Sequence, residues 1–277
     1  MSFVIINKKK YDIKKFSNGG NNLGYINFDK NKIGKILFLS EERKINKTLD
    51  TQTYNENPYR EIEIHKQCNK IIKENLTANL VKFYKYYIYN DSIILIIEKY
   101  DGDLLSIINK LTLKQLWSIF FQIFITFIIL QDKLGFYQGD FGLTNILYKK
   151  VNISKKYFYY KYNGVKYRVP NEGYKIAISD YGNAIINNFI LADYEKEYYN
   201  NNISNRFELY EILLLLQKYL LNFKDTSDKN YRTKFNKLQD IIYKNIRFNL
   251  YNNRYTINEK YTEPADKNYL LENIFNK

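Results

Sequence analysis

The pattern of apolar and polar positions changes near residue 102 and divides the chain into two parts. Residues 1–101 contain short apolar runs separated by polar turns, which is typical of β-strands. From Asp103 onward, apolar residues recur at helical spacing over long stretches. The sequence therefore predicts a small strand-rich part followed by a larger part that is mainly helical.

Four apolar runs in the first part pair into two predicted hairpins. Polar residues near Asn31 separate the first pair, and Asn90–Asp91 separates the second. Short polar connections of this kind join antiparallel strands, so we expect a small antiparallel sheet. The four runs are 25–29 and 35–40, then 80–89 and 92–100.

One helix is predicted between the two hairpins, over residues 60–74. Ile64, Cys68, Ile71 and Ile72 fall on one face of this helix, and its lysines fall on other faces. The apolar face should therefore pack on the strands while the lysines remain in water.

The second part begins with a strongly apolar helix that ends before Gly135. Its apolar core, LWSIFFQIFITFIIL, spans 15 residues, whereas a bilayer needs roughly 20. Ser118, Gln122 and Thr126 recur at every fourth position and form one polar stripe. We predict a buried helix rather than a membrane span. A second apolar helix, over residues 207–220, is also expected in the core.

Between these two helices the chain returns to extended patterns. Asn163–Gly164 separates two tyrosine-rich runs, and both residues tolerate the positive φ of a type I′ turn. We therefore expect an inserted β-hairpin at about 155–176. The stretch from about Lys224 is polar and only weakly periodic, and it predicts no definite element.

Composition favours a folded, enzyme-sized intracellular protein. The chain has 277 residues, 45% of them hydrophobic, and only three prolines. A single cysteine cannot form an internal disulfide, and a single histidine, His65, cannot form a histidine metal cluster. The first residues lack the apolar core of a signal peptide. We expect a cytoplasmic location and a monomer without membrane contact.

The net charge of +14 at first favours a polyanionic partner. However, the basic residues are 36 lysines and 7 arginines, spread along the chain in ones and twos rather than gathered in a block. Lysine, tyrosine, isoleucine and asparagine are all abundant, which is typical of an AT-rich genome. Nucleic acid is therefore not expected as the main substrate.

Two short segments carry the residues best suited to chemistry. In the loop GFYQGDFGLTN, Asp140 and Asn145 lie five positions apart, between the buried helix and a strand. Later, Asp180 follows an apolar strand and precedes Tyr181 and Gly182. Phosphoryl transfer from ATP requires such a set, because one carboxylate orients the acceptor hydroxyl while an amide and a second carboxylate hold magnesium. Taken singly, each segment is also explained as an ordinary turn.

Together these segments resemble the catalytic loop H-R-D-L-x-x-x-N and the D-F-G motif of eukaryotic-type protein kinases. Their order, internal spacing and helix-to-strand context agree with that family. The resemblance spans roughly residues 15–222 and is strongest at 134–184. It implies that Asp140 is the catalytic base, and that Asn145 and Asp180 are metal ligands.

Weaker matches fall where the family has them. Gly19, Gly20 and Gly24 resemble a glycine-rich loop over phosphates, although an Asn-Gly turn explains that stretch nearly as well. Glu61 resembles the glutamate that pairs with the ATP lysine, with Glu63 as the alternative and a solvated helix face as the simpler explanation. Glu98 and Tyr100 resemble the hinge segment whose backbone binds the edge of adenine in that family.

Departures from the family pattern are as informative as the matches. Lys35 lies early in the expected strand and Lys44 lies late, so the sequence leaves the ATP lysine unassigned. Gln138 and Gly139 replace the histidine and arginine of the catalytic loop, so control by a phosphorylated activation loop is less expected. Gly142 stands where a lysine is usual, and no A-P-E follows Asp180.

These departures, with the inserted hairpin, resemble divergent Ser/Thr protein kinases of large DNA viruses, whose setting would be the host cytoplasm. The resemblance implies an α+β, bilobal protein-kinase-like fold. Residues 1–101 would form a small antiparallel N-lobe with one helix, and 102–277 a larger, mainly helical C-lobe. It also implies ATP and Mg²⁺ as cofactors and a protein substrate. Two alternatives stay open: a pseudokinase binding module, and a small-molecule phosphotransferase of the aminoglycoside or choline type.

Overall fold

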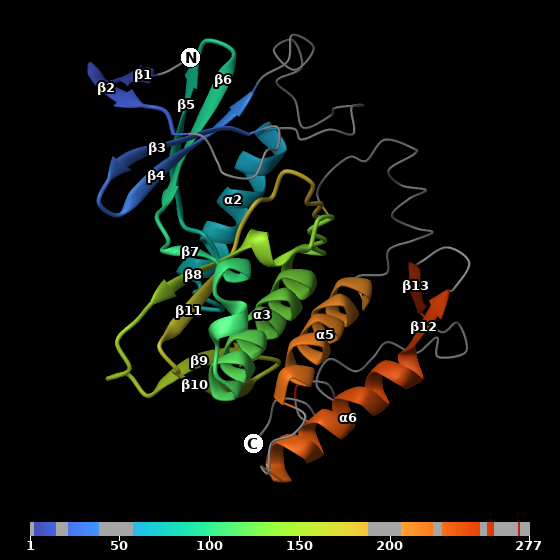
Figure 1. Ribbon diagram of the computed structural model, residues 1–277. Helices are drawn as coiled ribbons and strands as arrows, with labels where there is room; N and C mark the ends of the chain where they lie inside the picture. The colour runs from blue at the N-terminus through green and yellow to red at the C-terminus, as the bar shows by residue number, and fades with distance from the viewer. Residues whose placement is uncertain are drawn as a thin grey trace.

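The computed structural model is a mixed α+β protein with several small antiparallel sheets (Figure 1). It describes residues 3–14, 22–38, 58–187, 206–223, 229–249, 254–257 and 271. The helices are α2 (Pro58–Lys73), α3 (Leu113–Leu134), α5 (Arg206–Leu220) and α6 (Lys229–Asn245), with single 3₁₀ turns at Leu104–Ser106, Ile108–Lys110, Leu143–Asn145 and Leu221–Phe223.

The strands form five antiparallel sheets among the described residues. The largest has the order β3-β4-β6-β5, and a three-stranded sheet has the order β11-β8-β7. Three further hairpins are β1–β2, β9–β10 and β12–β13. The bounds are β1 Phe3–Ile6, β2 Lys9–Asp12, β3 Asn22–Asp29, β4 Lys32–Phe38, β5 Phe83–Tyr89, β6 Ser92–Glu98, β7 Gly102–Asp103, β8 Ile146–Lys150, β9 Tyr157–Tyr162, β10 Val165–Pro170, β11 Tyr174–Ile178, β12 Ile246–Asn249 and β13 Arg254–Ile257.

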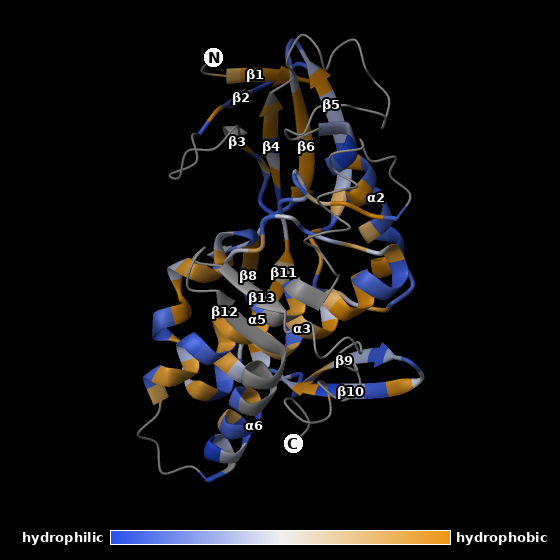
Figure 2. Ribbon diagram, turned by 90° about the vertical axis from the view of Figure 1, so that its right-hand side faces the viewer, coloured by the Kyte–Doolittle hydropathy of each residue, from blue (hydrophilic) through white to orange (hydrophobic). Residues whose placement is uncertain are grey.

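The four-stranded sheet is covered on both faces. In the central strand β6, Ile93, Leu95 and Ile97 belong to one apolar cluster, which includes Ile62 of α2. Ile94 and Ile96 point the other way and pack with Val4 and Ile6 of β1. Figure 2 shows β6 as hydrophobic along its length. The sequence pattern predicted this sheet and α2, but it did not predict the β1–β2 hairpin that covers the second face.

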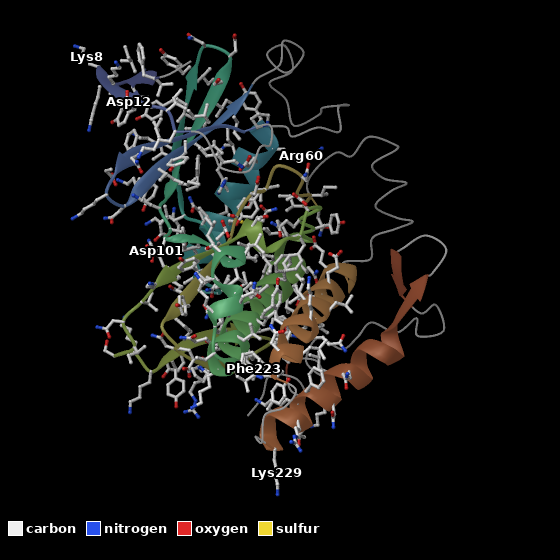
Figure 3. The ribbon with its side chains drawn as sticks, in the orientation of Figure 1. Lys8, Asp12, Arg60, Asp101, Phe223 and Lys229 are labelled. Carbon is white, nitrogen blue, oxygen red and sulfur yellow. The ribbon has the colours of Figure 1, made fainter. Side chains whose placement is uncertain are left out.

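The sheet and α2 lie at one end of the molecule, and α3, α5 and α6 lie at the other (Figure 1). Asp101 lies at the junction between them (Figure 3). Its N–H donates to the Tyr148 carbonyl, and its carboxylate accepts a hydrogen bond from the Lys150 N–H at 2.8 Å. The segment after β6 is thereby fixed against β8.

Helix α3 is the centre of the main core. Thr112 and Gln115 form a capping box at its start, and Gly135, with φ of 58°, ends it in the left-handed conformation. By length and composition this helix could cross a membrane, but most of it is buried within the protein. The prediction of a buried helix ending at Gly135 is confirmed.

Gln122, in the polar stripe of α3, forms hydrogen bonds with main-chain groups on the free edge of β11. Gln122 donates to the Tyr174 carbonyl at 3.0 Å and accepts from the Ile176 N–H at 3.2 Å. Asn79 donates both to Gln122 and to the Ile176 carbonyl. Buried main-chain groups cost free energy when left unpaired, so these contacts determine where β11 lies.

The inserted hairpin lies where the sequence predicted it. Asn163 and Gly164 have φ of 48° and 78°, as a two-residue turn requires. Tyr160, Tyr162 and Tyr167 pack into the α3 core, and the opposite face of the hairpin is exposed. The polar region after Lys224, in which no definite element was predicted, contains α6, β12 and β13.

Candidate functional site

A buried ion pair joins β4 to α2. The Lys35 ammonium lies 2.9 Å from the Glu61 carboxylate, and both side chains are almost fully buried. Strand β4 begins at Lys32 rather than Lys35, which places Lys35 in the middle of the strand, opposite Leu95. The sequence pattern predicted that this strand begins at Lys35, three residues after its actual start, so Lys35 was not assigned as the ATP lysine. In the structure, Lys35 is the partner of Glu61.

The direction of the Glu61 side chain follows from its place in the first turn of α2, on the face that packs inward. Glu63, the alternative, is partly exposed and bonds Lys66 and Gln67 on the helix surface. Burial alone would raise the pKa of Glu61, but the Lys35 charge holds that pKa well below its ordinary value. Glu61 is therefore ionised at neutral pH.

Asp180 meets the same lysine from the other side. Its carboxylate accepts a hydrogen bond from the Lys35 ammonium at 2.8 Å and is 38% exposed. Burial alone would lower the pKa of Lys35, but Glu61 and Asp180 together raise it above its ordinary value. Three residues that are far apart in the sequence thus form one charged cluster with one side open to solvent.

The backbone at Asp180 is held in an uncommon conformation. Its φ of 56° is left-handed, which costs a non-glycine residue about 1–3 kcal/mol unless the surroundings impose it. Ser179 supplies such a constraint, because its N–H and its hydroxyl both donate to the Asn145 carbonyl at 2.9 Å.

Asp140 and Asn145 lie in direct contact. The Asn145 amide donates to the Asp140 main-chain carbonyl at 2.8 Å and to its carboxylate at 3.3 Å. Asp140 is exposed, whereas Asn145 is buried in the 3₁₀ turn that precedes β8. Because Ser179 binds Asn145, the loop of Asp140 is tied directly to the residue before Asp180. Asn145 therefore links the loop of Asp140 to the segment that carries Asp180.

Glu208 of α5 also binds the loop that carries Asp140. The sequence pattern did not predict this contact. Its carboxylate accepts from the Gln138 N–H at 2.6 Å and the Gly139 N–H at 3.2 Å. Gln138 in turn donates to the Ser179 carbonyl. Burial raises the pKa of Glu208 to about 8, although the two N–H donors oppose that rise. A glutamate within a strongly apolar helix was the available signal.

Gly139 explains one departure from the expected loop. Its φ is 74°, and a Cβ atom at this position would lie 2.6 Å from the Asn183 carbonyl oxygen. No larger side chain fits without moving the main chain. The absence of an arginine here is therefore built into the local path of the chain.

The lone histidine and the lone cysteine are core residues that link α2 to the loop after Asp180. The His65 ring packs 4.8 Å from the Tyr181 ring and 5.5 Å from the Phe83 ring, between centroids. Cys68 is fully buried, and burial raises the pKa of its thiol to about 12, which leaves it neutral and unreactive. Tyr181 donates to the Ile178 carbonyl and completes this link.

The segment Glu98–Asp101 connects the two ends of the molecule. Glu98 accepts hydrogen bonds from Lys149 and from the Tyr100 hydroxyl, and Tyr100 is buried. The N–H groups of Lys99 and Asp101 donate to the Asn31 and Tyr148 carbonyls. No partner for the Tyr100 N–H is found among the described residues, which leaves a main-chain donor free for a ligand.

The predicted glycine-rich loop is only partly described. Gly19 and Gly20 lie outside the described residues. Gly24 lies in β3 with φ of 140°, and a Cβ there would approach the Lys14 carbonyl oxygen to 2.4 Å. The close approach of Lys14 explains this glycine by packing alone, so Gly24 by itself is no evidence for a phosphate site.

The donor set at Asn145 and Asp180 fits a hard cation such as magnesium. Oxygen ligands from one carboxylate and one amide, completed by phosphate and water, are typical of magnesium in phosphoryl-transfer sites. Asp180 uses one carboxylate oxygen for Lys35, and the other accepts no hydrogen bond from the described residues. No group of three or more His, Cys, Asp or Glu side chains gathers in the described part of the chain, so a closed protein cage for a metal is absent there.

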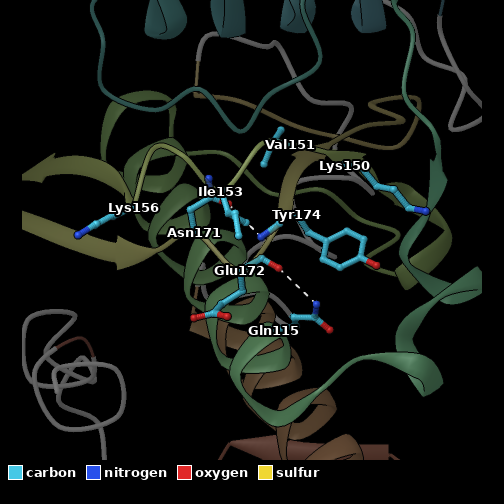
Figure 4. A pocket seen from close by; sticks show the side chains of 9 residues that line it. Gln115, Lys150, Val151, Ile153, Lys156, Asn171, Glu172 and Tyr174 are labelled. Atoms are coloured by element: carbon cyan, nitrogen blue, oxygen red, sulfur yellow. Dashed lines mark hydrogen bonds between the residues drawn. The ribbon is translucent and has the colours of Figure 1, made fainter.

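One open hollow lies well away from these residues, at the base of the inserted hairpin (Figure 4). Gln115 donates to the Glu172 carbonyl across it, and Asn171 accepts from the Gly173 N–H. These contacts brace the hairpin against α3. Lys35, Glu61, Asp140 and Asp180 do not line this hollow.

Comparison with known proteins does not assign the chain to a family. No family model matches it, and no curated protein sequence does.

Proposed function

We propose that this chain is an ATP- and Mg²⁺-dependent protein kinase that transfers the γ-phosphate to serine or threonine hydroxyls. The observation that carries the proposal is the cluster of Lys35, Glu61 and Asp180, next to the paired Asp140 and Asn145. A lysine fixed by a glutamate, an aspartate after a strand, and an Asp–Asn loop are the separate parts that kinase phosphoryl transfer requires.

Each residue has a role in this proposal. Lys35, held by Glu61, would contact the ATP phosphates, and the free Tyr100 N–H would bind the edge of adenine. Asn145 and Asp180 would hold magnesium, which bridges the phosphates and neutralises charge that develops on them. Asp140, exposed and oriented by Asn145, would position the acceptor hydroxyl and accept its proton.

The arrangement of elements is consistent with a bilobal kinase-like fold. The sheet β3-β4-β6-β5 with α2 would form the smaller lobe, and the helices α3, α5 and α6 the larger. The catalytic-loop departures and the inserted hairpin still favour a resemblance to divergent kinases of large DNA viruses. The pseudokinase alternative was motivated by a missing lysine, and the Lys35–Glu61 pair removes that motive.

The test is Mg²⁺-dependent transfer of γ-phosphate from labelled ATP to a basic protein, an acidic protein and a panel of small alcohols. Asp140→Asn and Asp180→Ala should each abolish labelling of protein. Asp12→Asn is the matched control, because Asp12 is an exposed carboxylate on the distant strand β2 (Figure 3) and should leave transfer unchanged. All variants should keep the urea midpoint of the parent, except for small shifts at Asp180.

Three results would contradict the proposal. Label on a small alcohol rather than on protein would assign the chain to the small-molecule phosphotransferases. Transfer that persists in Asp140→Asn would remove the proposed base. Absence of both transfer and ATP binding in the folded parent protein would leave a binding module.

A further inference from the structure

A groove runs along the outer edge of the inserted hairpin, remote from the charged cluster. Its volume is about 810 Å³, within the range of ligand sites in proteins. All six residues of β10 line one wall, the first turns of α3 line another, and α6 contributes two side chains. Figure 2 shows the hairpin extending sideways from below α3.

The wall formed by β10 is an unpaired strand edge. The two-residue turn makes Tyr162 and Val165 a hydrogen-bonded pair, so Lys166 and Arg168 occupy the alternate positions, whose N–H and C=O groups point away from β9. The next such position is Pro170, and its carbonyl accepts a hydrogen bond from Ser118 of α3 at 2.6 Å. At Pro170, therefore, the outward carbonyl of β10 points toward α3, whose first turns line the groove, and the alternation of the strand places the groups of Lys166 and Arg168 on the same edge.

The edge of β11 and the edge of β10 both face α3, but α3 forms hydrogen bonds with them to different extents. Gln122 satisfies the edge of β11, whereas the polar stripe of α3 reaches the edge of β10 only at Pro170. Within the described chain, the main-chain groups of Lys166 and Arg168 have no partner beyond β9. Four main-chain groups, two donors and two acceptors, are therefore presented to the groove at the spacing of a β-ladder.

The side chains around this edge are basic and aromatic. The cations are Lys114, Lys166, Arg168 and Lys234, against one carboxylate, Glu172. The Arg168 guanidinium lies 4.9 Å from the centroid of the Tyr157 ring, and the Lys234 ammonium lies 5.4 Å from that of the Trp117 ring. Stacking on these rings holds the charges at the groove. Tyr159, beside them, is 70% exposed.

We propose that the β10 groove binds an extended, acidic segment of a partner protein, which adds to the hairpin as a third strand. Its main chain would pair with Lys166 and Arg168, its carboxylates would face the four cations, and its alternate apolar side chains would pack on the aromatic wall. This docking function goes beyond phosphoryl transfer and does not depend on it.

Two other occupants fit less well. Single-stranded DNA would suit the cations and rings, but its sugar-phosphate backbone offers acceptors and no donors for the carbonyls of Lys166 and Arg168. A second copy of this chain, paired edge to edge through β10, would place these cations opposite each other, and like charges directly opposite are destabilising. An acidic peptide satisfies both the main-chain and the charge requirements.

The test begins with selection of random displayed peptides on the immobilised full chain, compared with its Lys166→Glu/Arg168→Glu variant. We expect enriched peptides to be acidic, with apolar residues at alternate positions. Fluorescein-labelled synthetic copies are then titrated by anisotropy. Charge reversal at Arg168 should weaken binding at least about tenfold. The equal change in charge at Lys30→Glu, an exposed turn residue far from the groove, should change it less than about twofold.

Pairing of the main chain has its own test. Arg168→Pro removes one outward N–H without breaking a bond to β9, and Arg168→Ala removes the same charge while keeping that N–H. Binding to the proline variant should be weaker than to the alanine variant by up to about tenfold, the value of one hydrogen bond. Circular dichroism and urea unfolding confirm that both variants are folded.

Several outcomes would overturn the docking proposal. These are equal enrichment on the parent and the charge-reversed variant, enrichment of neutral or basic peptides, and equal binding to the proline and alanine variants. Tight binding of oligothymidylate, lost on charge reversal, would assign the groove to nucleic acid. Dimerisation that Arg168→Glu alters would assign it to a second copy. All of these readouts are independent of kinase activity.

Discussion

The Lys35–Glu61 pair predicts an asymmetric response to mutation. Lys35→Met leaves the Glu61 carboxylate about 97% buried, and among the described residues His65, at 3.7 Å, is then its one remaining basic neighbour. Removing one partner of a buried pair typically costs about 3–5 kcal/mol, because the remaining charge is uncompensated. Replacing both charges by apolar side chains of similar size is often nearly neutral. We therefore expect Lys35→Met to be strongly destabilising and Lys35→Met/Glu61→Leu to recover most of the loss.

Urea unfolding at neutral pH measures these differences, and the two single variants with the double variant form a complete cycle. The pH dependence gives a second readout. Because the pKa of Glu61 is lowered in the folded parent, its contribution is present above the unfolded value of about 4.5 and is lost as the pH falls below it. In Lys35→Met the buried carboxylate can take up a proton, so the penalty should shrink in acid. Additive losses in the double variant, with no change in acid, would refute the pairing of β4 with α2.

Three further predictions concern residues that hold the fold around the site. Because burial raises the pKa of Glu208 to about 8, the parent should lose a few kcal/mol of stability as the pH rises from about 4.5 to 8, and Glu208→Gln should flatten that slope in urea titrations. Gly139→Ala should lower the free energy of unfolding by about 2 kcal/mol or more, and Gly164→Ala by only about 1 kcal/mol. Both glycines have positive φ, but only the new Cβ at position 139 would clash with a main-chain atom. Equal losses would contradict the expected clash with the Asn183 carbonyl. Gln122→Leu should lower the free energy of unfolding by about 2–4 kcal/mol, because it leaves buried main-chain groups of β11 without hydrogen-bond partners. Thr126→Val should lower it by about 1 kcal/mol, and urea midpoints measure both. The reverse order would contradict the role of Gln122 in binding the edge of β11.

Elements with strong local signals were predicted well from the sequence. The Asn163–Gly164 turn, the helix ending at Gly135 and the inward face of α2 each depend on residues close together in the chain. The loop with Asp140 and Asn145 was found for the same reason, since its spacing is visible within a few positions.

Features that depend on long-range packing were missed or misplaced. Lys35 was not assigned from the sequence because strand ends are poorly marked, and only pairing with β6 fixes its register against Glu61. Glu208 is one polar residue in an apolar helix until the Gln138 and Gly139 N–H groups are seen beside it. The β1–β2 hairpin was not predicted, because its role is to cover a sheet face whose exposure the sequence does not show.

Each segment of the candidate site is held in place by at least one buried residue. Glu61 is fixed by α2, Asp180 by Ser179 and Asn145, and the Asp140 loop by Glu208. Gly139, which replaces the arginine expected to bind a phosphorylated loop, belongs to the same set of contacts because its N–H binds Glu208. If the proposed kinase function is correct, the position that would hold this arginine is instead held by the buried carboxyl group of Glu208. In the unmodified chain, Lys35 already lies against both Glu61 and Asp180, so no added phosphate is needed to bring these groups together.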